Sequence, residues 1–207
     1  RFSDAQLVRL EASLSEAESM ISHAQVQAFA GERCLGREWF ESPAFRRSPI
    51  YQAQRLFGLA ERDYGYYWEM TDQIIAAAKL PFPDRVSEYK RLEKAQGAIP
   101  RWYIFSRLIA PSASKTLFKF VSETANLRAA RTAVAIERYA LAHEGKLPDT
   151  LAELAPTWQP APLADPYTGG PLQFTKLSKG YLIFSLGYKN ENAGGQKARY
   201  LGFGVER

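Results

Sequence analysis

The hydrophobic pattern of the chain changes once, near Trp158, and this change limits the folds that the chain can adopt. Before Trp158 apolar residues recur every three or four positions, which is the spacing of amphipathic helices. After it come three short aromatic or β-branched runs, which predict two or three antiparallel strands: PLQFTKL, GYLIFSLG and ARYLGFGVE. The sequence therefore predicts an α+β fold, with a mostly helical N-terminal region, one long helix and a small C-terminal antiparallel sheet.

Composition supports a folded protein without covalent crosslinks. The chain has 207 residues, 46% of them hydrophobic, which is enough for a sizeable core. Its one cysteine, Cys34, excludes an intrachain disulfide and a zinc cluster built from several cysteines. We interpret Cys34 as a buried, inert thiol.

A capping box marks the start of the first helix. Ser3 is followed three residues later by Gln6, and Phe2 is placed to pack on Leu7. Further along, apolar residues alternate at spacings of three and four and predict one narrow stripe that packs on another helix of the same chain. The stripe consists of Leu7, Leu10, Leu14, Ala17, Ile21, Ala24 and Ala28.

Several more helices follow. Pro43 and Pro49 predict an irregular connection, and the next helix carries Tyr64, Tyr67 and Trp68 on one face. The remaining predicted helices are one capped by Asp84 and ending at Gly97, a long one over about 112–144, and a short one that is capped by Asp149 or Thr150 and ends at Pro156. We predict two domains, residues 1–110 and residues 111–207.

The stretch LADPYTGGPLQF, residues 163–174, has the features of a corner in the chain. Proline at position 166 favours an extended conformation at Asp165, and Thr168 to Gly170 suit a turn. Pro171 then leads into a strand. We predict that Asp165, Pro166, Gly169, Gly170 and Pro171 form a structural turn in which the Asp165 carboxylate accepts hydrogen bonds from nearby backbone amides.

The order of these elements resembles the periplasmic part of the major pseudopilin of bacterial type II secretion, over about residues 124–195. It is also similar to a group of uncharacterised, membrane-anchored bacterial envelope proteins in which a helical region precedes a pilin-like tail, and this second resemblance is the one we favour. The matching positions are Tyr139, Leu147, Pro148, Leu151, Leu154, Asp165, Pro166, Gly169, Gly170, Pro171, Phe184, Ser185 and Gly187.

The pseudopilin resemblance implies a calcium site in the last loop. There the chain offers one carboxylate, Glu191, beside Asn190 and Asn192, whereas calcium prefers several carboxylates among six to eight oxygen ligands. We favour a plain hairpin loop and expect no metal and no cofactor.

The sequence contains few groups suited to catalysis. His23 and His143 are the only histidines, neither is in a catalytic spacing, and no phosphate-binding glycine loop or Gly-x-Ser-x-Gly motif is present. These features favour a protein that is not an enzyme. The alternative is an enzyme or small-molecule-binding protein with a pocket between the helical region and the sheet, lined by Tyr64, Trp68, Trp102 and Tyr139.

Residues 101–120, RWYIFSRLIAPSASKTLFKF, combine four cations with aromatic residues and contain no acid. Our preferred interpretation is that the aromatic side chains pack in the core and the cations point outward. Contact with an anionic membrane surface is the second interpretation, and single-stranded nucleic acid is the least favoured.

The favoured resemblance implies a periplasmic or otherwise extracytoplasmic location. The chain starts at Arg1 rather than methionine, so we expect an N-terminal membrane anchor that is absent from this sequence. We expect a non-enzymatic domain that contacts an as yet unknown protein partner. A third alternative is a pseudopilin-like assembly subunit of a secretion system.

Overall fold

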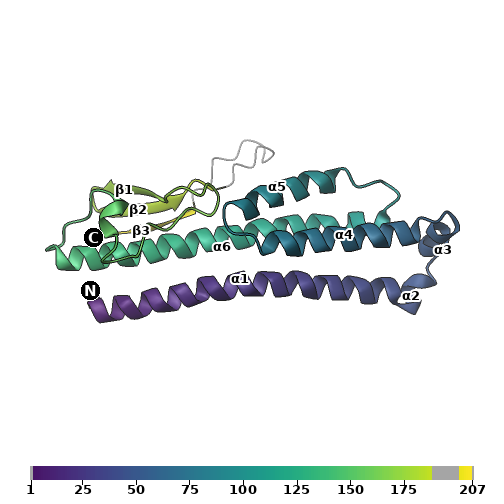
Figure 1. The fold of residues 1–207 in the computed structure, drawn as a ribbon, viewed down its shortest axis with the longest axis horizontal. Helices are drawn as coiled ribbons and strands as arrows, with labels where there is room; N and C mark the ends of the chain where they lie inside the picture. Colours follow the sequence, from purple (N-terminus) through teal and green to yellow (C-terminus); the bar gives the residue numbers. More distant parts are fainter. Residues whose placement is uncertain (1, 188–200, 207) are drawn as a thin grey trace. The chain divides into compact units, whose positions relative to one another are not determined.

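The computed structural model describes residues 2–187 and 201–206. These residues form a mostly helical chain with a three-stranded antiparallel sheet near its C-terminus (Figure 1), which confirms the predicted α+β fold. The elements are α1 (Asp4–Glu41), α2 (Pro43–Arg46), α3 (Pro49–Leu56), α4 (Ala60–Ala78), α5 (Asp84–Gly97), α6 (Ile104–Ala142), the 3-10 helix η1 (Leu151–Leu154), β1 (Gln173–Leu177), β2 (Gly180–Ser185) and β3 (Leu201–Val205).

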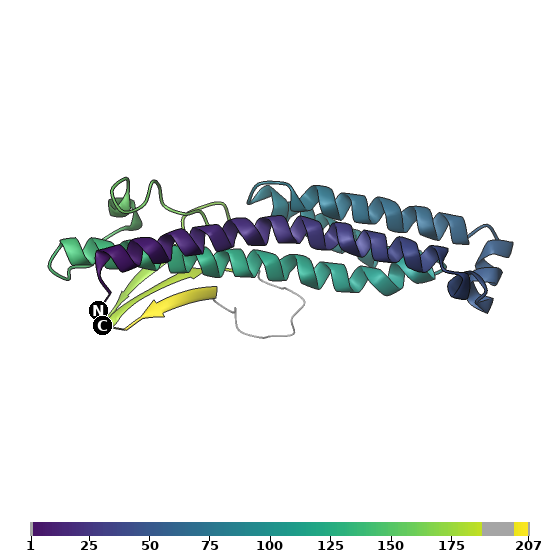
Figure 2. The same ribbon diagram turned by 90° about the horizontal axis from the view of Figure 1, so that it is seen from below.

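The chain divides into two compact units. Unit 1 comprises residues 1–21 and 120–207, and unit 2 comprises residues 22–119. Both α1 and α6 contribute to each unit, so the predicted division after residue 110 falls inside α6. In unit 1 the beginning of α1 runs beside the end of α6 in the opposite direction (Figure 2).

Helix α1 begins as predicted, but it buries a different face. The backbone N–H of Ser3 donates to Gln6 Oε1 at 2.8 Å, and the N–H of Gln6 donates to Ser3 Oγ at 3.3 Å, which completes the capping box. Leu10, in contrast, is 40% exposed, and Ala24 and Ala28 are exposed too. The buried positions of α1 are Leu7, Gln25, Phe29, Gly36 and Phe40.

The spacing of these buried positions explains why α1 buries a different face from the predicted apolar stripe. Phe29 and Phe40 are eleven residues apart, as are Gln25 and Gly36. An eleven-residue repeat matches 3.67 residues per turn, whereas the predicted stripe assumed a repeat of 3.5. In a helix of 38 residues the two patterns diverge by a large part of a turn, so the later alanines of the stripe point away from the core.

Arginines of α6 pair with carboxylates of α1 inside unit 1. Arg131 binds both Glu11 and Glu18, at 2.9 and 2.6 Å, and Arg128 Nε donates to Glu18 Oε1 at 2.7 Å. These four side chains are 14–28% exposed. Burial works against the charge of Arg131, but its hydrogen bonds to the two glutamates outweigh this and raise the pKa of the guanidinium. We refer to these residues as the arginine ladder.

The connection between α1 and α4 is helical rather than irregular as predicted. Ser42 and Ser48 each accept a hydrogen bond from a backbone N–H three residues on, and a proline follows each of them. Serine at the N-cap with proline at the first helical position is a strong start signal. Two short helices, α2 and α3, result.

Two further helix starts differ from the prediction. Helix α6 begins at Ile104 and continues through Pro111, so it is longer at its N-terminal end than expected. Asp84, the predicted N-cap of α5, is instead its first helical residue. The N-cap position is Pro83, and no side chain caps it. The cap of η1 is Thr150, one of the two predicted alternatives, and its backbone N–H donates to Glu153 Oε1 at 2.9 Å.

The sheet has the strand order β1-β2-β3, and both strand pairs are antiparallel. The sequence predicts a turn at Ser178, Lys179 and Gly180; Ser178 and Lys179 form the turn between β1 and β2, whereas Gly180 is the first residue of β2. Tyr181 and Ile183 of β2 are fully buried against α6, and the Tyr181 hydroxyl donates to the Ala133 carbonyl oxygen at 3.2 Å. The core of unit 1 consists of Ala129, Ala133, Ala135, Ile136, Leu151, Leu154, Leu172, Tyr181 and Ile183.

Residues 163–174 form the predicted corner. The buried Asp165 carboxylate accepts hydrogen bonds from the backbone N–H of Tyr167 at 2.9 Å and from the Ser185 hydroxyl at 2.8 Å. Its backbone N–H donates to the Gly170 carbonyl oxygen at 2.7 Å, which closes the turn. Pro166 is buried beside it, and an isolated bridge pairs Ala164 with Pro171. Asp165 therefore fixes the turn and ties it to β2.

The two corner glycines should differ in their tolerance of a side chain. Gly169 has φ +76°, where alanine is strained, whereas a Cβ on Gly170 would meet only Thr168 Oγ1 at 3.7 Å. We expect Gly169→Ala to lower the free energy of unfolding by about 1–2 kcal/mol and Gly170→Ala to change it by less than about 0.5 kcal/mol. Urea denaturation of both variants tests this, and equal losses would contradict the turn geometry.

The arginine ladder should contribute measurably to stability. Arg131→Ala leaves Glu11 without its partner in a half-buried site, so we expect the free energy of unfolding to fall by about 3 kcal/mol. The matched control is Arg91→Ala, since Arg91 pairs with Glu88 on the surface, where solvent screens the pair, and its loss should affect stability far less. Urea denaturation at fixed ionic strength measures both; a loss for Arg131→Ala no larger than the control would show the ladder to be unimportant.

Candidate functional site

The buried carboxylate of Asp63 caps the N-terminus of α6 from α4. Asp63 is 0% exposed, and it accepts hydrogen bonds from the backbone N–H groups of Phe105 at 3.0 Å and Ser106 at 3.1 Å. The Ser106 hydroxyl and the Gln54 amide also donate to it. Because negative charge is favourable at a helix N-terminus, this arrangement stabilises the junction of α3, α4 and α6.

An aromatic cluster fills the core of unit 2 next to this cap. Phe45 stacks on Trp39 with ring centres 4.3 Å apart and meets Phe105 edge-on at 4.3 Å. Phe40 lies 4.8 Å from Tyr64. Aromatic pairs at these distances add about 0.5–1.5 kcal/mol each beyond the area they bury. The cluster therefore stabilises the position of α2 and α3 in unit 2.

Of the four aromatic residues predicted to bind a ligand, the structure brings together Tyr64 and Trp68, whose ring centres are 6.0 Å apart. Tyr64, Trp68 and Trp102 belong to unit 2, and Tyr139 belongs to unit 1. Arg33 lies over the Trp68 ring at 3.8 Å, and Trp102 is 56% exposed. A pocket formed jointly by the helical region and the sheet stays a prediction.

Tyr139 makes contacts of its own within unit 1. Its ring stacks on His143 with centres 3.9 Å apart. Its hydroxyl donates to Glu153 Oε2 at 3.2 Å. These contacts connect the end of α6 to η1, so they give Tyr139 a structural role.

Helix α3 exposes an apolar face. Ile50, Leu56 and Phe57 are 52%, 84% and 75% exposed, and Ala53 is exposed between them. Trp102 adjoins this helix, because the Gln54 amide donates to the Trp102 carbonyl oxygen at 2.7 Å. We refer to Ile50, Leu56, Phe57 and Trp102 as the α3 surface.

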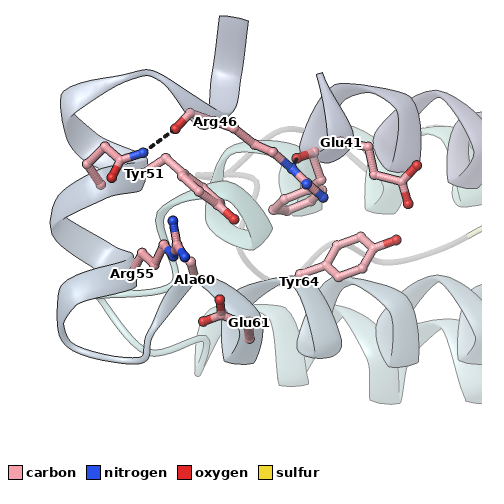
Figure 3. Close-up of a pocket in the computed structure, with 9 residues that line it drawn as sticks. Glu41, Arg46, Tyr51, Arg55, Ala60, Glu61 and Tyr64 are labelled. Carbon is pink, nitrogen blue, oxygen red and sulfur yellow. Dashed lines mark hydrogen bonds between the residues drawn. The ribbon is translucent and has the colours of Figure 1, made fainter. Parts of the chain in front are cut away.

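The other side of α3 lines a pocket of about 380 Å³, whose walls are Phe40, Glu41, Arg46, Tyr51, Gln52, Arg55, Ala60, Glu61 and Tyr64. In Figure 3 the Arg46 side chain enters from α2 and the Arg55 side chain from α3, with Tyr51 between them in this view. Arg46 Nε donates to the Phe40 carbonyl oxygen at 3.3 Å, and Glu41 pairs with Arg37 at 3.0 Å. The pocket thus presents two guanidinium groups to a small polar ligand.

Unit 1 contains a second pocket, of about 390 Å³, between the start of α1, the end of α6 and β3. Its apolar lining includes Phe2, which is 65% exposed, and Leu141, which is 46% exposed. Three carboxylates stand at this pocket: Glu137, Glu144 and Glu206. It is suited to an apolar side chain flanked by positive charge.

In residues 2–187 and 201–206, no three His, Cys, Asp or Glu side chains lie close enough together to hold a metal ion. The calcium positions considered above, Asn190, Glu191 and Asn192, lie outside the described residues. Cys34 is exposed rather than buried, which corrects the expectation for its thiol.

Across the part of the chain that the structure describes, no helix has an apolar stretch long enough to cross a bilayer. No protein-family model, curated protein sequence or solved structure matches the chain.

Sequence reasoning did not identify the α3 surface or either pocket. Ile50, Ala53 and Phe57 recur at spacings of three and four, which is the signal of an apolar helical face. That spacing was obscured by the prolines on either side, which suggested an irregular segment. The spacing alone also could not show that this face lies outward rather than in the core.

Tyr67 shows how closely unit 2 is packed. Its hydroxyl donates to the Glu32 carbonyl oxygen at 2.9 Å, and burial raises the pKa of Tyr67 to about 12. A Cβ on Gly36 would lie 2.0 Å from that hydroxyl oxygen, so only glycine fits where α1 passes the ring.

Two glycines on α1 therefore provide a matched test of this packing. We expect Gly36→Ala to lower the free energy of unfolding by about 1–3 kcal/mol, because the new methyl group overlaps the Tyr67 ring. Gly31 has open space around it, so Gly31→Ala should raise stability by about 0.5–1 kcal/mol through helix propensity. Thermal denaturation of both variants measures the difference, and the same sign of change in both would contradict the packing.

Proposed function

We propose that this chain is a non-enzymatic, extracytoplasmic domain of a membrane-anchored bacterial envelope protein and that it contacts another protein. The envelope assignment rests on the resemblance of residues 124–195 to the periplasmic part of the major pseudopilin. Its motif positions include Leu151 and Leu154, which pack with Tyr181 in the core of unit 1, and Asp165, which hydrogen-bonds to Ser185.

The buried acids favour a structural domain over an enzyme. Asp63 and Asp165 are both about 1% exposed or less, and each has hydrogen bonds to backbone N–H groups. Glu18 is held by two arginines of the ladder. Catalytic carboxylates usually face a cavity with hydrogen-bonding capacity left for substrate. In this chain the carboxylates at these positions instead hold helices and a turn together.

The observation that carries a protein contact is the apolar pocket of unit 1. It is lined by Phe2, Leu7, Leu141 and Val205 and has Glu137, Glu144 and Glu206 beside them. Partially exposed large apolar side chains beside carboxylates suit a partner segment with an apolar anchor and basic neighbours. Five of the nine residues that line the pocket, from Glu137 to Gly145 on and after α6, lie in the part of the chain that carries the resemblance.

Binding of a small molecule is the second candidate function. The pocket beside α3 supports it, because Arg46, Arg55 and Tyr51 offer donors to a small anionic compound. Its position in unit 2 differs from the pocket expected from the sequence, since Tyr64 is the one predicted residue that lines it.

Location can be tested on the full-length protein in its own bacterium. We expect fractionation to place it with the envelope and external protease to digest this domain in spheroplasts. Recovery of the full-length product in the cytoplasm, protected from protease, would refute the proposal.

The protein contact can be tested by photocrosslinking in the same cells. A benzoylphenylalanine at position 141 should yield one discrete crosslinked partner, and a second substitution, Glu144→Arg, should reduce the yield about tenfold or more by placing like charge against a basic partner. The matched control is position 177, because Leu177 is similarly exposed, at 52%, on β1 of the same unit. Equal products from both positions would contradict the contact, and a crosslink solely to another copy would favour a pseudopilin-like assembly subunit instead.

A further inference from the structure

The α3 surface contains the two most exposed large apolar side chains of the described residues, Leu56 and Phe57. Leu56 and Phe57, at 84% and 75% exposure, are adjacent at the end of α3, and Gly58 follows in a left-handed conformation with φ +63°. The hydrogen bond between Gln54 and the Trp102 carbonyl oxygen places the backbone of a second segment beside α3. Such a group is far from the usual scatter of single exposed apolar residues, so it indicates a binding surface.

These side chains protrude instead of lining a recess. Neither Leu56 nor Phe57 is among the walls of the 380 Å³ pocket, which lies on the side of α3 that carries Tyr51 and Arg55. A protein partner would need a matching cavity for each protruding side chain. A lipid interface adapts to Leu, Phe and Trp side chains without one, and short amphipathic helices use this property to bind membranes.

The segments that carry the α3 surface have an excess of positive charge. Six arginines and one glutamate, Glu61, occur in residues 42–62 and 99–108, and all six arginines are exposed. Arg46 and Arg55 line the pocket on the other side of α3, and the other four are Arg47, Arg62, Arg101 and Arg107. The two acids that precede or follow residues 42–62 are engaged, because Glu41 pairs with Arg37 and Asp63 caps α6. Exposed arginines are attracted to an anionic bilayer.

We propose that the α3 surface docks on a bilayer that contains anionic phospholipid. Leu56, Phe57 and Trp102 enter the interface between headgroups and acyl chains, and the surrounding arginines contact lipid phosphates. This interaction goes beyond the protein contact proposed for unit 1 and does not depend on it, since it uses residues of unit 2.

The proposed membrane surface differs from the one expected from the sequence, which comprised residues 101–120. Arg101, Trp102 and Arg107 at its start are exposed and belong to the new surface. Phe105 and Leu117 are buried, at 5% and 0% exposure, and pack in the core. Only the first part of that segment therefore takes part, and α3 supplies the rest.

Vesicle flotation tests the proposal with defined lipids. The chain is mixed with vesicles of phosphatidylcholine and phosphatidylglycerol at a ratio of about 3:1, or with phosphatidylcholine alone. We expect binding to the anionic vesicles to be at least about tenfold stronger and to weaken at about 0.5 M salt, because exposed charges are screened. Equal binding to both vesicles, or no binding to either, would overturn the proposal.

Two pairs of variants assign the binding to the α3 surface. Leu56→Ser with Phe57→Ser should reduce partitioning about tenfold or more, whereas the control Leu177→Ser on β1 should not change it. Arg47→Glu with Arg101→Glu should also reduce partitioning about tenfold or more. Arg9→Glu, on an exposed part of α1, should have little effect on it. Equal losses for variants and controls would show that binding is unrelated to this surface. Circular dichroism verifies that each variant is folded.

Two further measurements distinguish a bilayer from free phosphate and from an acidic protein. Inorganic phosphate at about 10 mM should leave flotation almost unchanged if the surface needs a bilayer, and complete competition would indicate a site for free phosphate. If the wild type fails to float while benzoylphenylalanine at position 57 crosslinks to a protein in cells, the surface binds an acidic protein and the lipid proposal is wrong.

Discussion

Pairing between the arginine ladder of α6 and the carboxylates of α1 determines how unit 1 is assembled. Arg131 binds Glu11 and Glu18, and Arg128 binds Glu18 on one side and the Ala164 carbonyl oxygen on the other, at 2.7 Å. One arginine thus holds the first helix, the long helix and the corner before the sheet. Because these charges are half-buried, each depends on its partner, and the face that α1 turns inward follows from them.

The remaining buried acids work in the same way at other junctions. Asp63 accepts hydrogen bonds from the buried backbone N–H groups at the start of α6, and Asp165 accepts one within the corner and another from the Ser185 hydroxyl on β2. A buried backbone N–H without a partner is costly, so these carboxylates stabilise turns and helix ends that apolar packing alone would leave unsatisfied. The polar interior is consequently committed to structure.

Two of the apolar regions that the described residues expose differ in charge. The pocket of unit 1 has Glu137, Glu144 and Glu206 beside apolar side chains, whereas the segments that carry the α3 surface of unit 2 are rich in arginine. Opposite charges select different partners, because like charge repels and complementary charge speeds encounter. A domain with two such surfaces is suited to joining an envelope component to lipid, which is how the two proposals fit together.

Local signals in the sequence predicted the features that depend on a few neighbouring residues. The capping box of Ser3 with Gln6, a cap at Asp149 or Thr150 and a turn at residues 178–180 each involve residues close together in the chain, so their chemistry is visible in a short window. The change of period near Trp158 likewise predicted the sheet. The corner at Asp165 belongs to this group, although its bond to Ser185 crosses twenty residues.

Tertiary structure decided the helix boundaries, buried faces and exposed side chains that depend on partners far away in the sequence. Helix α6 starts at Ile104 because Asp63, 43 residues before Ser106, caps it, and α1 turns Gln25 and Phe29 inward along a repeat that follows its packing partners. The ladder joins Glu18 to Arg128 across 110 residues. Whether Leu56 or Cys34 is exposed likewise depends on which elements pack nearby. A sequence pattern states which residues share a helical face, but only the folded chain determines whether another element covers that face.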